Sequence, residues 1–172
     1  ELKISCWTGR KKDKSASAKV TDDNDAEKGT ASVNKMLLGK CDELIAIQKF
    51  VANVRNINYD ATMPWSDLGQ RLLTMPVYFK HHPILTGLQT EFYRMADAFC
   101  NGYWVEVSRA QARIGSLHQA EDYPSEESIR SKFSFTISYI PLPDAGDFRI
   151  DIGNEQQQVL SDHYSEYYNK QL

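Results

Sequence analysis

The sequence lacks the motifs by which common enzyme classes are recognised. Its 172 residues contain no Walker A motif, no GxSxG, no HExxH and no CxxC. These motifs supply a phosphate cradle, a nucleophile or a pair of metal ligands, so their absence argues against a P-loop ATPase, an α/β-hydrolase and the common zinc sites. No apolar run approaches the roughly 20 residues of a membrane-spanning helix, and no signal peptide is visible. We therefore expect a protein that is not an enzyme, binds no cofactor and makes no membrane contact.

Cysteine and histidine are scarce. The three cysteines, Cys6, Cys41 and Cys100, are widely spaced and odd in number. This pattern argues against a disulfide framework and favours a reducing compartment such as the cytoplasm, with buried or incidental thiols. The one histidine pair, His81-His82, lies near an expected helix start and is assigned a surface or packing role. The sequence thus predicts no metal site.

The net charge is small, at −3, and gives no global reason to expect a nucleic-acid partner. One local basic run follows Trp7, and it consists of Arg10, Lys11, Lys12 and Lys14. Such a run would suit a phosphate group or an acidic partner. Runs this short are also common at solvated strand ends and loops. The sequence leaves both interpretations open.

The composition, with 41% hydrophobic and 25% charged residues, is typical of a globular chain, and the length suits one domain. Alternating apolar side chains predict strands, and an apolar period of three to four predicts helices. Strands are expected at 2–6, around 19–21, and at 32–38, 71–75, 133–139 and 148–152. Helices are expected from Asp42, as N-cap, to 56–60, at about 82–117, and from 154 onward. Residues 15–32 are expected to form a polar segment between strands. Asp22, Asp23 and Asp25 resemble the start of a calcium-binding loop, but the later glycine and glutamate are not at the spacing of an EF-hand, so no calcium site is predicted.

The expected fold class is α+β, with a small antiparallel sheet head and a long antiparallel helical stalk. Residues 1–76 and 122–152 would form the head, and 82–117 and 154–172 the stalk. The helix at 82–117 would be about 50 Å long, which exceeds a compact domain of this size, so part of it should project or pair with another helix. We treat 1–172 as a single domain and expect it to be a piece of a longer chain. The stalk could then continue as a coiled coil and support a homo-oligomer.

Aromatic residues recur along this long helix at Phe92, Phe99, Tyr103 and Trp104. They could form a base-stacking platform. Their helical spacing favours packing in a core or a helix pair instead.

The segment from 122 to 152 has the most distinctive local pattern. Pro124 ends the preceding helix, and Ser125 is expected to cap a new one. The strands at 133–139 and 148–152 are expected to pair across a Pro/Gly turn. On the second strand Arg149 lies between Asp147 and Asp151. This pattern predicts either surface ion pairs among these three residues or a patch that docks a partner.

Several of these segments resemble an uncharacterised domain family found in bacteria and tailed phages. The matching segments are Trp7-Thr8-Gly9-Arg10-Lys11-Lys12, then Tyr123-Pro124-Ser125 with Ile129-Arg130 and Lys132-Phe133, and Gly146-Asp147-Phe148-Arg149. The resemblance spans most of the chain, with looser agreement at 15–38 and 58–76. The family has no established activity. Its genes often lie beside those of MoxR- or CobS-like AAA+ ATPases and CobT-like proteins with a von Willebrand A-type domain, which implies an adaptor role beside an ATPase.

Three functions follow from these observations. The first is a non-enzymatic phage interaction module that docks a AAA+ ATPase or assembles with itself in the infected cell. The second is a nucleic-acid-binding accessory protein that uses the basic run. The third is a structural component of the virion. The residues predicted to contact a partner or a phosphate are Trp7, Arg10, Lys11, Lys12, Lys14, Asp147 and Arg149.

Overall fold

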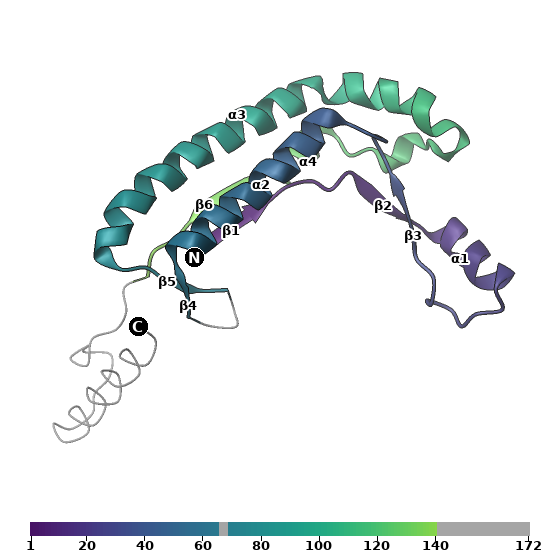
Figure 1. Cartoon of the computed structure of the whole chain (residues 1–172). Helices are drawn as coiled ribbons and strands as arrows, with labels where there is room; N and C mark the ends of the chain where they lie inside the picture. The colour runs from purple at the N-terminus through teal and green to yellow at the C-terminus, as the bar shows by residue number, and fades with distance from the viewer. Residues whose placement is uncertain (66–68, 141–172) are drawn as a thin grey trace, which may run out of the picture. The chain divides into compact units, whose positions relative to one another are not determined.

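The computed structural model describes residues 1–65 and 69–140, in which short strands alternate with helices (Figure 1). In chain order the elements are β1 (Leu2–Ser5), β2 (Arg10–Asp13), α1 (Lys14–Asp23), β3 (Val33–Met36), α2 (Asp42–Ala61), β4 (Met63–Pro64), β5 (Arg71–Leu72), α3 (Met75–Ile114), the 3₁₀ turns η1 (Gly115–Leu117) and η2 (Ala120–Asp122), α4 (Glu126–Arg130) and β6 (Ser134–Ile137). The predicted α+β class is therefore confirmed. The chain divides into two compact units, Glu1–Ser138 and Tyr139–Leu172, and all of these elements belong to the first.

The strands form two-stranded antiparallel ribbons throughout the described ranges. β1 pairs with β6, β2 with β3, and β4 with β5. The strand expected at 133–139 thus exists as β6, and it pairs with the N-terminal strand. The second strand of the expected hairpin, at 148–152, lies outside the described residues.

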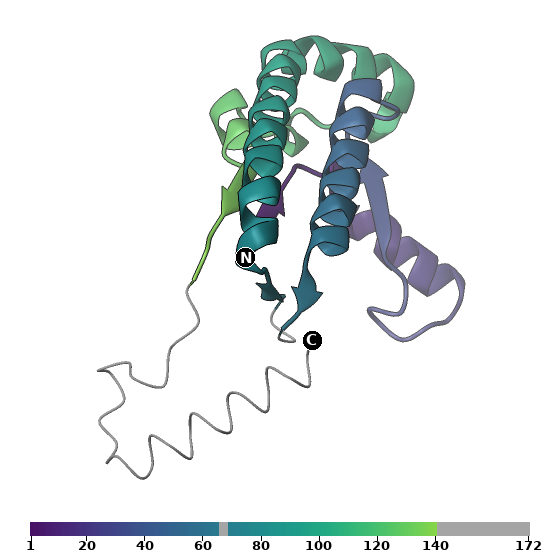
Figure 2. The same cartoon turned by 60° about the vertical axis from the view of Figure 1, so that its left-hand side comes forward.

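The two longest helices, α2 and α3, form an antiparallel hairpin connected by the β4–β5 ribbon (Figure 2). The buried residues of α2 include Leu44, Ile47, Val51 and Val54, whose spacing of three and four places them on one face. α3 has 40 residues and is about 60 Å long. The predicted stalk partner at 154–172 lies outside the described residues, whereas α2 is the helix against which α3 is seen to pack.

The core of this unit contains a cluster of aromatic rings between α3 and the chain segments beside it. Phe92, Phe99 and Tyr103 of α3 are buried and contact Trp7, Phe133 and Phe135 with ring centroids 5.7–6.3 Å apart. Rings at these distances contribute both buried apolar area and favourable edge contacts. The core interpretation of the helical aromatics is thereby confirmed for three of the four, while Trp104 is exposed.

The β1–β6 ribbon lies along the α2–α3 hairpin, and helix side chains bond to both of its outer edges. Arg55 of α2 donates to the Ile4 carbonyl on the β1 edge (3.1 Å). On the β6 edge, Gln89 of α3 donates to the Phe135 carbonyl (2.7 Å), and the Phe135 amide donates to the Tyr93 hydroxyl (3.1 Å). These contacts satisfy backbone groups that an isolated ribbon would expose.

The strand predicted around 19–21 is wrong, because these residues belong to α1. Asp13 caps α1, and its carboxylate accepts from the Ala16 amide (2.9 Å) and the Ser15 hydroxyl (2.7 Å). The cap decides the conformation here, since Val20 is exposed and α1 has no strong apolar stripe.

Two helix starts also differ from the predictions. α3 begins at Met75, with Pro76 in its first turn, and Pro83 lies inside the helix. Because either proline suits a first turn, the later one gave a start seven residues too late. Cys41, not Asp42, occupies the N-cap of α2, and Asp42 lies in the first turn. An acidic side chain there interacts favourably with the helix dipole. The predicted cap at Ser125 is confirmed.

Within these same ranges, none of the helices has the length and apolarity that crossing a membrane requires.

Two buried tyrosines provide a test of the core. Tyr123 donates to the Leu37 carbonyl (2.7 Å), whereas the Tyr103 hydroxyl has no hydrogen-bond partner in the described part of the chain. We expect Tyr123→Phe to lower the free energy of unfolding by about 1–3 kcal/mol, because a buried carbonyl loses its donor. Tyr103→Phe should leave that free energy unchanged or raise it by about 1 kcal/mol. Urea denaturation measures both, and equal losses would contradict the assigned hydrogen bonding.

Candidate functional site

The basic run predicted as a contact site is divided between the two faces of β2. Antiparallel pairing places Lys11 opposite Lys35, and Arg10 and Lys12 opposite Met36 and Asn34. Since successive side chains of a strand point to opposite faces, Lys11 and Lys35 share one face, and Arg10 and Lys12 share the other. The run therefore acts as two separate groups of charges.

The face of Lys11 and Lys35 carries an ion network centred on the buried carboxylate of Asp122 in η2, to which Lys11 reaches from a partly exposed position. Lys11 donates to one oxygen of the Asp122 carboxylate (2.6 Å), and the other oxygen is paired with Lys35. The Lys35 and Asp122 side chains are only 8% and 3% exposed. Lys35 also donates to the side-chain oxygen of Gln119 (3.1 Å) and lies 4.0 Å from the Asp13 carboxylate. One carboxylate thus holds both strands of the β2–β3 ribbon against the segment after α3.

The pKa of Asp122 reflects this arrangement. Burial alone would raise the pKa, but the hydrogen bonds from Lys11 and Lys35 outweigh burial and lower the pKa below its ordinary value of 3.8. The carboxylate is therefore charged at neutral pH, and both lysines keep a fixed counter-ion.

The outer face of β2 carries the charges that are free to meet another molecule. Arg10 and Lys12 are exposed, and neither forms an ion pair with any residue in 1–65 or 69–140. Lys14, the first residue of α1, is exposed as well. We define Arg10, Lys12 and Lys14 as the basic face.

The remaining predicted contact residues lie elsewhere. Trp7 is buried, and its ring packs against Phe99 and Tyr103, so it is not available for stacking on a nucleic-acid base. Lys11 is held by Asp122. Asp147 and Arg149 lie outside the described residues.

The turn before β2 sets the direction of the basic face. Gly9 has a φ of +66°, and a β-carbon at this position would lie 2.9 Å from Cδ2 of Leu44. Both the backbone conformation and the close approach of α2 therefore require glycine. The chain leaves the core at Trp7 and enters β2 three residues later.

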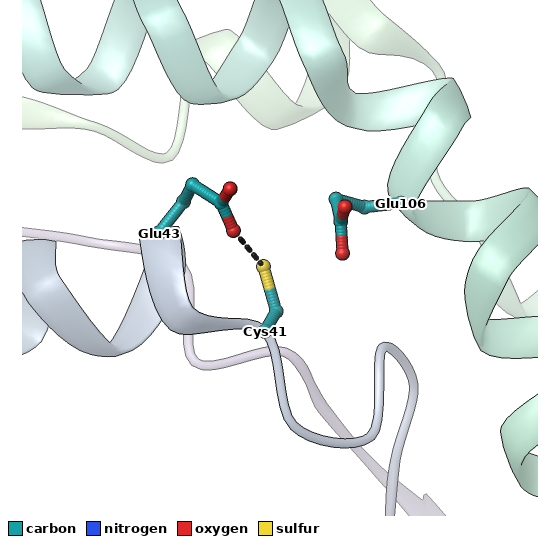
Figure 3. Close-up of side chains that lie close together, drawn as sticks. All are labelled: Cys41, Glu43 and Glu106. Carbon is teal, nitrogen blue, oxygen red and sulfur yellow. Dashed lines mark hydrogen bonds between the residues drawn. The ribbon is translucent and has the colours of Figure 1, made fainter.

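A second cluster brings together Cys41, Glu43 and Glu106 (Figure 3). Their ligand atoms all lie within 4.8 Å of one another, and within the described residues they are the group best placed to hold a metal ion. The Cys41 thiol is directed at the Glu43 carboxylate (3.5 Å). The buried carboxylate of Glu106 is paired with Arg109 and lies 3.8 Å from Arg113. A cation at this position would have to displace a proton from Cys41 and compete with two arginines for Glu106.

Cys41 is protonated in this cluster. Burial is the main reason that the pKa of its thiol is raised to about 11, and the hydrogen bond to Glu43 adds to the effect. Burial likewise raises the pKa of Cys6 and of Cys100. A thiol is a weak nucleophile compared with a thiolate, so this chemistry does not favour cysteine catalysis.

His81 has the packing role expected for it. It is buried, its Nε2 lies 3.2 Å from the Asn58 side-chain oxygen, and burial lowers its pKa.

The sequence contains local signals for two of the buried charges, Lys35 and Glu106. Lys35 lies on the same strand face as Val33 and Leu37, and Glu106 lies among the apolar positions of α3. A charged residue at an apolar position of a periodic pattern indicates a buried, paired charge. The partners, Asp122 and the two arginines, cannot be read from local pattern.

A scan against protein-family models finds no match to the chain, and searches of the curated proteins and of the solved structures find none either. The resemblance to the phage and bacterial family therefore stays a prediction.

We expect Asp122→Asn to destabilise the protein by about 3 kcal/mol at neutral pH, because it removes the nearer of the two carboxylates that pair with buried Lys35. Since folding lowers the pKa of Asp122, its contribution is complete well above pH 3.8 and is lost as the pH falls below that value. The difference between the variant and the wild type should therefore shrink in acid. Urea denaturation across this pH range is the measurement, and Asp60→Asn, on the exposed end of α2, is the control. An equal effect of both substitutions would contradict the network.

The cysteines offer a chemical test of the second cluster. With a pKa of about 11, Cys41 should react with iodoacetamide at pH 7 about 100-fold more slowly in the folded protein than in urea, because far less thiolate is present. Mass spectrometry of the labelled peptides gives the rate for each cysteine. Rapid labelling of Cys41 in the folded protein would mean that the thiol is neither buried nor hydrogen-bonded as described.

Proposed function

We propose that the protein is a non-enzymatic interaction module of a phage, and that it acts as an adaptor for a AAA+ ATPase. The observation that carries this proposal is the basic face, where Arg10 and Lys12 are exposed, without a counter-ion among the described residues, on a ribbon that Asp122 holds in place. A rigid, charged surface favours docking because little conformational entropy is lost when a partner binds. The ATPase as partner comes from the family resemblance alone.

Self-assembly is a second form of the same proposal. The exposed side chains of α3 include Phe79, Ile84, Trp104 and Val105, and a long helix with exposed apolar residues can pair with a copy of itself.

A nucleic-acid accessory is the alternative that the basic face also supports. Phosphate contacts would use Arg10, Lys12 and Lys14, without stacking by Trp7, which is buried. Such binding must weaken steeply with salt, because each contact releases a counter-ion. A virion structural component remains a further alternative.

The test is an affinity pull-down of the full-length protein from infected cells, analysed by mass spectrometry. We expect the wild type to recover a AAA+ ATPase, and Arg10→Glu/Lys12→Glu to lose it. The control Lys49→Glu/Lys80→Glu makes the same change of net charge at exposed positions of α2 and α3 and should retain the ATPase.

Other results would overturn either the adaptor role or the assignment of the basic face as its docking surface. Recovery of capsid or tail proteins alone would favour a structural role. The presence of the protein itself at fixed stoichiometry in purified particles would establish that role. Recovery of nucleic acid that is removed by salt would favour the accessory role. An ATPase retained by the double variant would exclude the basic face as the docking surface.

A further inference from the structure

The N–H groups on the outer edge of β2 point away from its partner strand. The Leu37 amide donates to the Gly9 carbonyl (2.8 Å), which makes Gly9 and Leu37 a hydrogen-bonded pair. Because such pairs alternate along an antiparallel ladder, the next one is Lys11 with Lys35. The intervening residues, Arg10 and Lys12, therefore direct their backbone N–H groups outward, toward the free edge.

This edge is open in the described part of the molecule, where no side chain bonds to the backbone of Arg10 or Lys12. The β1–β6 ribbon provides an internal comparison. Both of its edges are satisfied by helix side chains, from Arg55 on one side and from Gln89 and Tyr93 on the other. Among the described residues, helix side chains thus bond to both edges of one ribbon, whereas the outer edge of β2 has no such partner.

The three cations of the basic face lie along β2 and the start of α1. Arg10 and Lys12 project from the outer face of β2, and Lys14 follows at the start of α1. A lysine in the first turn of a helix is unfavourable because it meets the positive end of the helix dipole. Acidic side chains on an adjacent chain would compensate all three cations.

Resting on the proposed interaction function, we infer that the outer edge of β2 binds an extended acidic segment of a partner protein as a third strand of the β2–β3 ribbon. Backbone hydrogen bonds to the edge supply affinity in this mode of binding, and alternate side chains supply specificity. Residues of the added strand opposite Arg10 and Lys12 lie on the same face as these cations. The ligand is therefore a strand with glutamate or aspartate at every second position.

The Asp122 network supports this mode because it fixes the ribbon from the opposite face. Lys11 and Lys35, one from each strand, are held by the same carboxylate. The edge is thus formed before the ligand arrives, which reduces the entropy lost on binding.

Charged edges also serve to prevent unwanted strand pairing, and lysine is a common residue for that purpose. If this is the whole role of Arg10 and Lys12, no acidic strand will bind to the edge.

The experiment measures binding of a fluorescent seven-residue peptide, in which glutamate alternates with threonine, by anisotropy at low salt. Lys12→Ala removes one charge and should weaken binding a few-fold. Lys12→Pro removes the same charge and also the outward N–H, and should weaken binding about tenfold more, because a backbone hydrogen bond is lost. Proline is tolerated at this position of an edge strand, since the N–H it removes is not part of the ladder.

A modified ligand makes the test independent of how well the proline variant folds. The same peptide, methylated on the backbone nitrogens that face β2, keeps its charges and loses its donors. The wild-type protein should bind it about tenfold more weakly than the parent peptide.

The remaining outcomes overturn the inference. Equal binding of the methylated and parent peptides would show docking by charge without strand addition, and would leave the proposed adaptor function intact. Absence of binding by the parent peptide would show that the charged edge only prevents pairing. Binding of a single-stranded oligonucleotide in preference to the peptide would identify a phosphate surface instead. The pull-down tests the adaptor function separately, because it does not depend on how the partner is held.

Discussion

The Asp122 carboxylate is the contact on which the β2–β3 ribbon depends. Its two oxygens form ion pairs with two lysines, one from each strand. These pairs join the ribbon to the segment that follows α3. A buried charge is costly unless it is paired, so the network is stable only while all its members are present. The alternation of side chains along β2 directs Lys11 toward Asp122 and places Arg10 and Lys12 on the opposite face. The surface proposed for docking is thus a consequence of how the interior charges are satisfied.

The second buried acid, Glu106, has a comparable role at the N-terminal end of α2. It is paired with Arg109, and Arg113 also donates to the carbonyls of Leu38 (3.2 Å) and Lys40 (2.7 Å), in the turn between β3 and α2. The α2–α3 hairpin is therefore held by apolar packing along its length and by polar contacts near both ends, where the contact at the second end is that of His81 with Asn58. Cys41 lies beside these charges as a neutral thiol. This arrangement gives the cluster a structural explanation that needs neither a metal nor a nucleophile.

The sequence predicted the parts of the fold that have a strong local period. The apolar stripes of α2 and α3, the alternation in β1 and β6, and the cap at Ser125 are all local signals, and the structure contains each element close to its predicted place. Local pattern could not predict that β1 pairs with β6, because pairing over such a separation depends on the whole chain. It also missed α1, where the Asp13 cap outweighs a weak pattern. For the candidate site, the basic run was visible in the sequence, but its division between two faces required the register of β2 against β3.

The pairing of β1 with β6 has a consequence for how the chain acquires its structure during synthesis. The amide of Ser138 donates to the carbonyl of Glu1 (2.9 Å), across a separation of 137 residues. The first strand leaves the ribosome early, yet its partner is made only near the end of the unit. Until then, the side of β1 that joins β6 has no partner. Contacts of this range close slowly because the loop entropy must be lost first. During synthesis, the segment around β1 therefore exposes an unpaired strand edge of the kind that chaperones protect.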